Sequence, residues 1–175
     1  MNASDVATPA PAGAPEIGRS RKGRFLLLAF SILVADQWTK WLIERHLPEP
    51  SSIEIIPGLF HLSHVRNRGV AFGLFHSLGP DVARWGLSLL AAGALGLVVH
   101  LFRRTAPDAT RLLTALALVM GGAVGNLLDR VVQGSVTDFL GVYIGSYRWP
   151  DFNVADSAIC VGLTLLVIDS FRPHR

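Results

Sequence analysis

Four long apolar segments, separated by more polar connections, dominate the pattern of the chain. They cover about residues 25–46, 82–102, 111–131 and 154–171. The first three are about as long as a helix must be to cross the hydrocarbon core of a bilayer, and the fourth is somewhat shorter. The pattern therefore predicts an all-α integral membrane protein with four transmembrane helices.

The longest connection, residues 47–81, has a different pattern. Its β-branched and aromatic residues alternate partially with polar ones and are interrupted by Pro57, Gly58 and Gly69. Such a pattern is typical of short strands joined by turns, so we expect a small extramembrane β-sheet here. Asn67 lies close to Gly69 at a predicted turn, and the sequence leaves open whether Asn67 serves the turn or a functional site.

The chain before the first apolar segment falls into two parts. Residues 1–18 are rich in Ala and Pro, which predicts a disordered tail. The basic residues at 19–24 and the apolar run after them resemble the start of a signal peptide, but the run is too long and no Ala-x-Ala motif closes it. We therefore interpret residues 25–46 as an uncleaved transmembrane helix and residues 19–175 as one membrane-embedded domain.

The composition agrees with a membrane protein. Half of the residues are hydrophobic, 17% are charged, and the mean hydropathy is +0.41, which is high for a soluble domain. A net charge of +3 would favour nucleic-acid binding in a soluble protein. Here the basic residues lie mostly at the ends of apolar segments, which is typical of a membrane orientation signal, so no nucleic-acid partner is expected.

The basic residues also predict the orientation of the helices. They gather at 19–24, 103–111 and 172–175, and these stretches fall on one side of the membrane if there are four spans. The positive-inside rule places that side, with both termini, in the cytoplasm. The connections 47–81 and 131–151 are then outside. We interpret the second of them as a polar connection with three interfacial aromatic anchors, Tyr143, Tyr147 and Trp149.

Polar residues gather at the outer ends of the third and fourth segments. They belong to the stretch GGAVGNLLDRVVQGSVTDF at 121–139 and to FNVADS at 152–157. Charged groups at membrane depth cost about a few kcal/mol or more each, so the default reason for keeping several of them is function. We interpret the two stretches as halves of one site. Its polar members are Asn126, Asp129, Arg130, Asp138, Asn153 and Asp156.

The carboxyl groups predict the chemistry of this site. Two carboxylates brought close together cannot both ionise easily, so one keeps a proton while the other acts as a base, as in an aspartic protease. Asp129 adjoins Arg130, whose charge should keep Asp129 ionised in a positioning role. We therefore favour Asp138 and Asp156 as the catalytic pair and keep Asp129 as the alternative partner of Asp156. A purely structural role for Asp156 at a helix N-terminus also stays open.

For other residues of the apolar segments we predict structural roles. Asp36 and Lys40 are four residues apart and share one helix face, so they can form an ion pair. Small residues let membrane helices approach closely. The glycines expected to do so are Gly86, Gly93, Gly96, Gly121 and Gly125.

Cysteine and histidine give little support to metal or disulfide chemistry. Cys160 is the single cysteine, which excludes an intrachain disulfide, and its apolar surroundings predict a small core residue. His61, His64 and His76 lack partners at a recognised ligand spacing. We expect no metal site.

Five motifs resemble, in order and approximate spacing, those of bacterial lipoprotein signal peptidase, also called signal peptidase II. They are DQWTK at 36–40, NRGVAFG at 67–73, GGAVGNLLDR at 121–130, VTDF at 136–139 and FNVADS at 152–157. The resemblance runs from about residue 25 to residue 172. It implies an aspartic endopeptidase of the bacterial inner membrane that removes the signal peptide from diacylglyceryl-modified prolipoproteins, cleaving before the lipidated cysteine at the outer face.

The resemblance also implies roles for residues and partners. Asp138 and Asp156 would be the catalytic pair, without a metal or other cofactor. Expected partners are lipid-modified prolipoproteins, membrane lipids and globomycin-type cyclic peptide inhibitors, and the protein is expected to be a monomer. Residues expected to bind substrate, order the site or support it are Asn67, Gly69, Asn126, Asp129, Arg130, Asn153 and Ala155, with Asp36 and Lys40 as structural support.

Two other classes of function stay open on the sequence. A proton-coupled transporter or channel would use Asp36, Asp129 and Asp156 as a relay, together with Asp169 near the inner end of the fourth segment. Such a relay predicts carboxylates distributed through the depth of the membrane. A noncatalytic membrane scaffold would leave the outer acidic cluster without a role.

The four-span topology has a direct test. Reporter fusions placed after residue 107 and after residue 145 should report opposite sides of the membrane, because one span separates the two sites. Reporters of cytoplasmic and periplasmic location measure this. Finding both fusions on the same side would refute the four-span prediction.

Overall fold

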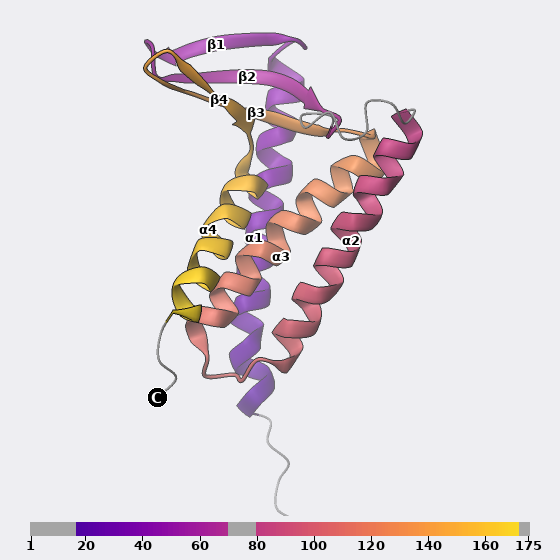
Figure 1. Cartoon of the computed structure of the whole chain (residues 1–175), viewed down its shortest axis with the longest axis vertical. Coiled ribbons are helices and arrows are strands. Elements are labelled where there is room, and N and C mark those ends of the chain that lie inside the picture. Colours follow the sequence, from indigo (N-terminus) through magenta and orange to yellow (C-terminus); the bar gives the residue numbers. More distant parts are fainter. Residues whose placement is uncertain (1–16, 70–79, 172–175) are drawn as a thin grey trace, which may run out of the picture.

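The computed structural model describes residues 17–69 and 80–171. The described chain forms four helices and one four-stranded sheet. Their order is α1 (Ile17–His46), β1 (Ser51–Ile56), β2 (Phe60–Asn67), α2 (Pro80–Arg104), α3 (Thr110–Gln133), β3 (Val136–Ile144), β4 (Tyr147–Phe152) and α4 (Val154–Ser170). Figure 1 shows the helices as a bundle with the sheet across one end.

The helices occupy the four predicted apolar segments. α1 begins at Ile17, so it includes the last two residues of the tail predicted over 1–18, and the rest of that tail lies outside the described residues. Within the described chain, α1, α2 and α3 each contain a stretch long and apolar enough to cross a membrane. Large apolar side chains point away from the bundle, as Leu27 and Leu89 do with 64% and 72% of their surface exposed. Such side chains suit contact with lipid, which makes this a multi-pass membrane protein.

α3 is the central helix of the bundle and packs against the other three (Figure 1). Glycines permit this close packing. A Cβ atom added to Gly121 would lie 2.5 Å from the carbonyl oxygen of Ala29 on α1, and one added to Gly122 would overlap the carbonyl oxygen of Ala155 on α4. The predicted packing role is therefore confirmed for Gly121.

Two predictions about helix faces are wrong. A Cβ atom added to any of the predicted contact glycines of α2 would meet no described atom within 4 Å. These glycines are Gly86, Gly93 and Gly96. Cys160 on α4 is exposed instead of buried in the core. Both errors have one cause: a helix that faces lipid is apolar on all sides, so its sequence does not show which side meets another helix.

The sheet joins the two long connections of the chain. Its strands are antiparallel neighbours in the order β1-β2-β3-β4. β1 and β2 confirm the strands predicted in residues 47–81, whereas β3 and β4 replace the polar connection predicted over 131–151. The pairing of β2 with β3 places Asn67 opposite Val136 and Val65 opposite Asp138. Residues about 70 positions apart, Asn67 and Asp138, thus meet beside the helix ends.

The close contact at Gly122 can be tested by adding one methyl group. Gly122→Ala should lower the melting temperature in detergent, because the new Cβ atom would overlap the backbone of α4. Overpacking of this kind typically costs about 1–3 kcal/mol.

Gly93→Ala is the matched control, since its added Cβ would meet no described atom within 4 Å. Alanine is favoured over glycine in helices by about 1 kcal/mol, so this variant should melt at the wild-type temperature or above it. Equal melting temperatures for the two variants would contradict the packing assignment.

Candidate active site

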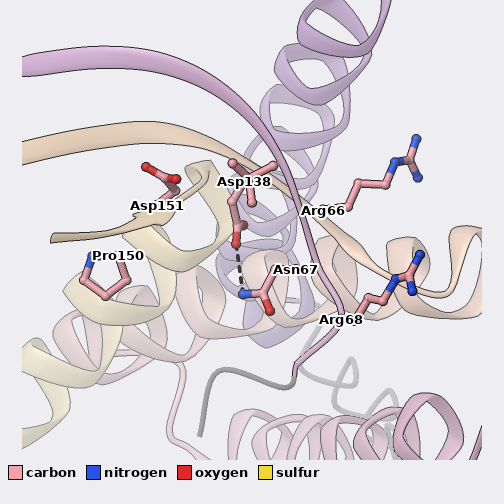
Figure 2. A pocket seen from close by; sticks show the side chains of 7 residues that line it. Arg66, Asn67, Arg68, Asp138, Pro150 and Asp151 are labelled. Atoms are coloured by element: carbon pink, nitrogen blue, oxygen red, sulfur yellow. Dashed lines mark hydrogen bonds between the residues drawn. The ribbon is translucent and has the colours of Figure 1, made fainter. Parts of the chain in front are cut away.

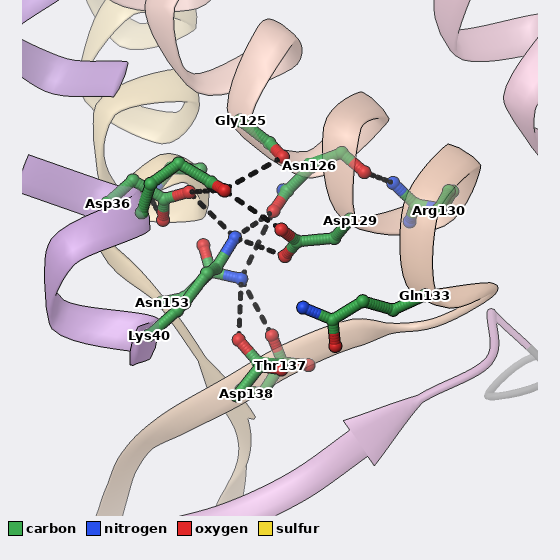
Figure 3. A network of polar contacts seen from close by, with 12 residues as sticks. Asp36, Lys40, Gly125, Asn126, Asp129, Arg130, Gln133, Thr137, Asp138 and Asn153 are labelled. Atoms are coloured by element: carbon green, nitrogen blue, oxygen red, sulfur yellow. Dashed lines mark hydrogen bonds and ion pairs between the residues drawn. The ribbon is translucent and has the colours of Figure 1, made fainter. Parts of the chain in front are cut away.

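A buried lysine lies between two aspartates where α1 meets α3. The ammonium of Lys40 is 2.7 Å from Oδ2 of Asp36 and 2.7 Å from Oδ2 of Asp129. The same nitrogen donates to Oδ1 of Asn126 at 3.0 Å. Asp36, Lys40 and Asp129 are at most 3% exposed. The predicted pair of Asp36 and Lys40 is confirmed, and Figure 3 shows it as part of a larger network.

Asp129 contacts Gln37 and Lys40, and not its sequence neighbour Arg130, whose charge was expected to act on it. Its Oδ1 accepts a hydrogen bond from Nε2 of Gln37 at 2.9 Å, and its Oδ2 pairs with Lys40. Nη1 of Arg130 donates instead to the carbonyl oxygen of Asn126 at 3.2 Å. Gln37 was not singled out from the sequence, although an amide beside Asp36 in an apolar run was a usable signal.

Asp36 also ties the start of α4 to α1. Its Oδ1 accepts the backbone N–H of Ala155 at 2.9 Å, and Ala155 is fully buried. A Cβ atom added to Gly125 would lie 2.5 Å from Oδ2 of Asp36. The same Cβ atom would lie 3.6 Å from Cβ of Ala155 on α4, so the predicted close helix contact at Gly125 is confirmed, and on α1 its partner is a carboxylate.

Asp156 lies at the first turn of α4, where it forms a capping box with Asn153. Oδ1 of Asn153 accepts the backbone N–H of Asp156 at 2.8 Å, and Oδ2 of Asp156 accepts that of Asn153 at 3.3 Å. The other oxygen, Oδ1 of Asp156, accepts Nδ2 of Asn126 at 2.7 Å. Asp156 thus serves the helix N-terminus with one oxygen and joins the polar network with the other.

Asp138 enters the network from β3. Its Oδ1 accepts Nδ2 of Asn153 at 2.8 Å, and its Oδ2 accepts Nδ2 of Asn67 at 3.0 Å. Oδ1 of Asn67 also accepts the N–H of Gly69 at 2.8 Å, and Gly69 has a positive φ of 75° that favours glycine. Asn67 therefore has a hydrogen bond in the turn and another to Asp138, which is compatible with both of the roles that the sequence left open.

The side chain of Asn153 links the two halves of the site. It donates to Asp138, accepts from the backbone of Asp156, and donates to Oδ1 of Asn126 at 3.2 Å. Through Asn126, the network continues to Lys40. The carboxyl groups of Asp36, Asp129, Asp138 and Asp156 are thus gathered in one cluster. This clustering disfavours the relay hypothesis, which predicts carboxylates spread through the membrane.

The environment of Asp138 favours its protonated form. The pKa of its carboxyl group is raised from 3.8 to about 7, chiefly by burial and in part by the negative charge of Asp156. Hydrogen bonds from Asn67 and Asn153 and the charge of Lys40 act in the opposite direction. A carboxyl group in this range can both release and accept a proton near neutral pH.

Asp138 and Asp156 line two separate cavities. One of about 500 Å³ reaches Asp138, and Figure 2 shows its polar lining. Its walls are Val65, Arg66, Asn67, Arg68, Asp138, Pro150 and Asp151. A second, of about 390 Å³, reaches Asp156 and is lined otherwise mostly by apolar or aromatic residues of β4 and α4. These are Trp149, Phe152, Ser157, Cys160 and Val161.

The histidines form no metal site among residues 17–69 and 80–171. The described part of the chain holds no group of three or more His, Cys, Asp or Glu side chains suited to a metal ion. His64 is buried, and its Nδ1 lies 2.7 Å from the carbonyl oxygen of Leu47. His76 lies outside the described residues.

Fold and site together define a class of protein. It is a multi-pass membrane protein with a buried acidic network at the end of the helices that meets the sheet. The family follows from comparison: residues 28–172 match the model of the Signal peptidase (SPase) II family, and the chain belongs to that family.

Known proteins are similar to this chain over most of its length. The lipoprotein signal peptidase of Geobacter sulfurreducens is 44% identical over 151 residues, which cover 86% of this chain and 93% of that protein. The lipoprotein signal peptidase of Halalkalibacterium halodurans is 37% identical over 151 residues, which cover 86% of this chain and 94% of that protein. A solved bacterial membrane enzyme superposes with a TM-score of 0.75 at 29% identity, over 87% of this chain and 95% of that one.

The raised pKa of Asp138 predicts a pH-dependent stability. The folded protein binds this proton more tightly than the unfolded chain does, so the contribution of Asp138 to stability should fall as the pH rises from 3.8 to about 7 and stay constant above. Asp138→Asn removes this contribution. Its melting temperature relative to wild type should therefore rise between about pH 5 and about pH 8.

Ser135→Ala is the control, because Ser135 is also buried beside this strand but carries no carboxyl group. Its difference from wild type should stay constant over the same range. A constant difference for Asp138→Asn as well would show that the pKa of Asp138 is not raised.

Proposed function

We propose that this protein is an aspartic endopeptidase that removes the signal peptide from diacylglyceryl-modified prolipoproteins, with Asp138 and Asp156 as the catalytic pair. Membership of the signal peptidase II family supports the substrate class. The observation that carries the choice of residues is the side chain of Asn153, which hydrogen-bonds to both residues of the pair. The two cavities support it too, since each aspartate lines one of them.

The proposed reaction uses the two carboxyl groups in turn. Asp156 accepts a proton from a water molecule, whose oxygen bonds to the carbonyl carbon of the scissile peptide, while protonated Asp138 gives its proton to the carbonyl oxygen. The tetrahedral intermediate then breaks its C–N bond. Asp156 returns its proton to the leaving amine, and Asp138 recovers a proton from a hydroxyl of the intermediate. The pair ends in its starting state, and the peptide bond has been exchanged for a carboxyl group and an amine.

The neighbouring polar residues order this pair. Asn67 and Asn153 hold the two oxygens of Asp138, and Asn126 holds one oxygen of Asp156. Lys40 is paired with Asp36 and Asp129, and it positions Asn126 by donating a hydrogen bond to its Oδ1. Gly69, Arg130 and Ala155 complete the set by backbone and side-chain contacts to Asn67, Asn126 and Asp36. Groups held by such contacts lose little freedom on binding substrate.

The proposed topology places the site at a membrane boundary. We propose four spans in the bacterial inner membrane, with both termini in the cytoplasm and the sheet on the periplasmic side. α4 would be the fourth span, since Leu163 and Val167 expose 49% and 55% of their surfaces away from the bundle. At this boundary the lipid of the substrate stays in hydrocarbon while water reaches the peptide. Residues 19–175 would form one domain, as a monomer, with 1–18 as a cytoplasmic tail.

The two cavities suggest how the substrate lies. The apolar cavity beside Asp156 suits the hydrophobic side of the cleavage point, and the cavity beside Asp138, whose lining includes several charged residues, suits the other side. A cyclic peptide inhibitor of the globomycin type would occupy the same space.

Removing either carboxyl group tests the pair. Asp138→Asn and Asp156→Asn should each lower the cleavage rate of a lipid-modified precursor about 100-fold or more, because Asn can neither take up the proton of the water nor return it. Since two carboxyl groups act as one unit, the double variant should be scarcely worse than either single one. The two single variants should still insert into the membrane.

Two further aspartates serve as comparisons. Asp129→Asn should lose activity together with thermal stability, because it leaves Lys40 with one buried acid instead of two. Asp169→Asn, at the other end of α4, should cleave at the wild-type rate. Near-normal turnover by Asp138→Asn, with a folded and inactive Asp129→Asn, would replace the pair by Asp129 and Asp156.

A further inference from the structure

A third cavity lies at the end of the bundle away from the sheet. It has a volume of about 560 Å³ and is lined mainly by residues of α1 and α2, with one residue of α3 and one of the connection between α2 and α3. Both helices run into this end of the molecule in Figure 1. The lining residues are Lys22, Leu26, Val99, Phe102, Arg103, Pro107 and Met120. None of them belongs to the acidic network described above.

The charged lining of this cavity is wholly basic. Nζ of Lys22 donates to the carbonyl oxygens of Phe102 and Arg103, both at 3.0 Å, and so binds the last turn of α2. An ammonium has three N–H groups, so one donor is left over. The guanidinium of Arg103 makes no hydrogen bond or ion pair within the described part of the chain. Two acids at this end, Asp108 and Asp169, line a separate cavity with Arg111.

The apolar lining follows the same order on both helices. Leu26 comes one turn after Lys22 on α1, and Val99 comes one turn before Arg103 on α2. On each helix the cation is thus farther from the sheet, and the apolar residue lies one turn closer to the sheet. Met120 of α3 continues this apolar surface. The cavity therefore offers positive charge at its mouth and hydrocarbon below it.

The depth of the cavity matches one surface of a bilayer. Lys22 and Lys40 are 18 residues apart on α1, which corresponds to about 27 Å along a helix. The hydrocarbon core of a bilayer is about 30 Å thick. If the acidic network lies at one boundary, Lys22 and Arg103 lie at the headgroup level of the opposite leaflet.

We propose that this cavity binds an anionic phospholipid of that leaflet. Arg103 and the remaining donor of Lys22 hold the headgroup phosphate, and the upper part of one acyl chain lies along Leu26, Val99 and Met120. Basic pockets between membrane helices are suited to lipid phosphates, and charge-assisted hydrogen bonds are the stronger kind. The bound lipid connects α1 with α2, two helices that otherwise pack mainly through α3.

Single-charge variants of neighbouring arginines test the headgroup contact. The full-length protein, purified in detergent, is titrated with phosphatidylglycerol or phosphatidylcholine, and bound lipid is counted by native mass spectrometry. Phosphatidylglycerol should bind the wild type more tightly than phosphatidylcholine does. Arg103→Gln should weaken phosphatidylglycerol binding about fivefold, the effect of one basic contact at a membrane surface.

Arg104→Gln is the matched control, because it removes the same charge from the adjacent residue, which is not part of the cavity lining. It should bind phosphatidylglycerol as the wild type does. Equal losses for Arg103→Gln and Arg104→Gln would overturn the proposal in favour of unspecific attraction to basic residues.

A second variant tests the acyl chain. Val99→Trp fills the apolar part of the cavity and leaves both cations in place, so it should also weaken phosphatidylglycerol binding. Glycerol phosphate, which has the headgroup chemistry without the chains, should neither bind stably nor raise the melting temperature. Normal lipid binding by Val99→Trp, or equal binding of glycerol phosphate, would show that no lipid chain enters the cavity.

Discussion

One buried cation holds the site together. Lys40 lies between the carboxylates of Asp36 and Asp129, and all three are almost completely buried. Placing an ion in such surroundings is costly, and removing one partner of a buried pair typically costs about 3–5 kcal/mol. The remaining bonds of Asp36 and Lys40 reach Ala155 and Asn126, so this cluster joins α1, α3 and α4. The polar network can therefore keep its geometry only while three helices stay in register.

Two asparagines connect this cluster to Asp138 and Asp156 by hydrogen bonds. Asn126 contacts both Lys40 and Asp156, and Asn153 contacts both Asn126 and Asp138. An amide offers donors and an acceptor on one short side chain, so it can bridge groups of either kind without adding charge. Burial then raises the pKa of Asp138, because few water molecules remain to solvate its charge. The same exclusion of water that costs stability thus prepares a carboxyl group for proton transfer.

The two ends of the bundle are held by different forces. At the sheet end, carboxylates, amides and backbone N–H groups fix the helices, while along α3 the close approach depends on glycines such as Gly121 and Gly122. At the far end, Lys22 binds the last carbonyl groups of α2. Lipid is as apolar as a leucine side chain and gives little hydrophobic driving force between helices. Close packing and polar contacts must therefore supply what the hydrophobic effect supplies in water.

The sequence by itself determined the helices, the first two strands and most of the residues that form the polar network. Long apolar segments are local signals, and a carboxylate such as Asp156 beside one of them is conspicuous because of its cost. Only the tertiary structure decided which groups pair: Asp129 with Lys40 instead of Arg130, and Asn67 with Asp138 across β2 and β3. It also decided that residues 136–144 and 147–152 form strands, since the first of these strands pairs with β2, far away in the chain, and the second pairs with the first. Only the tertiary structure likewise shows that Cys160 is exposed and that Gly93 has no close neighbour within the described residues. Pairing and facing depend on contacts between distant segments, and a uniformly apolar helix carries no local pattern that records them.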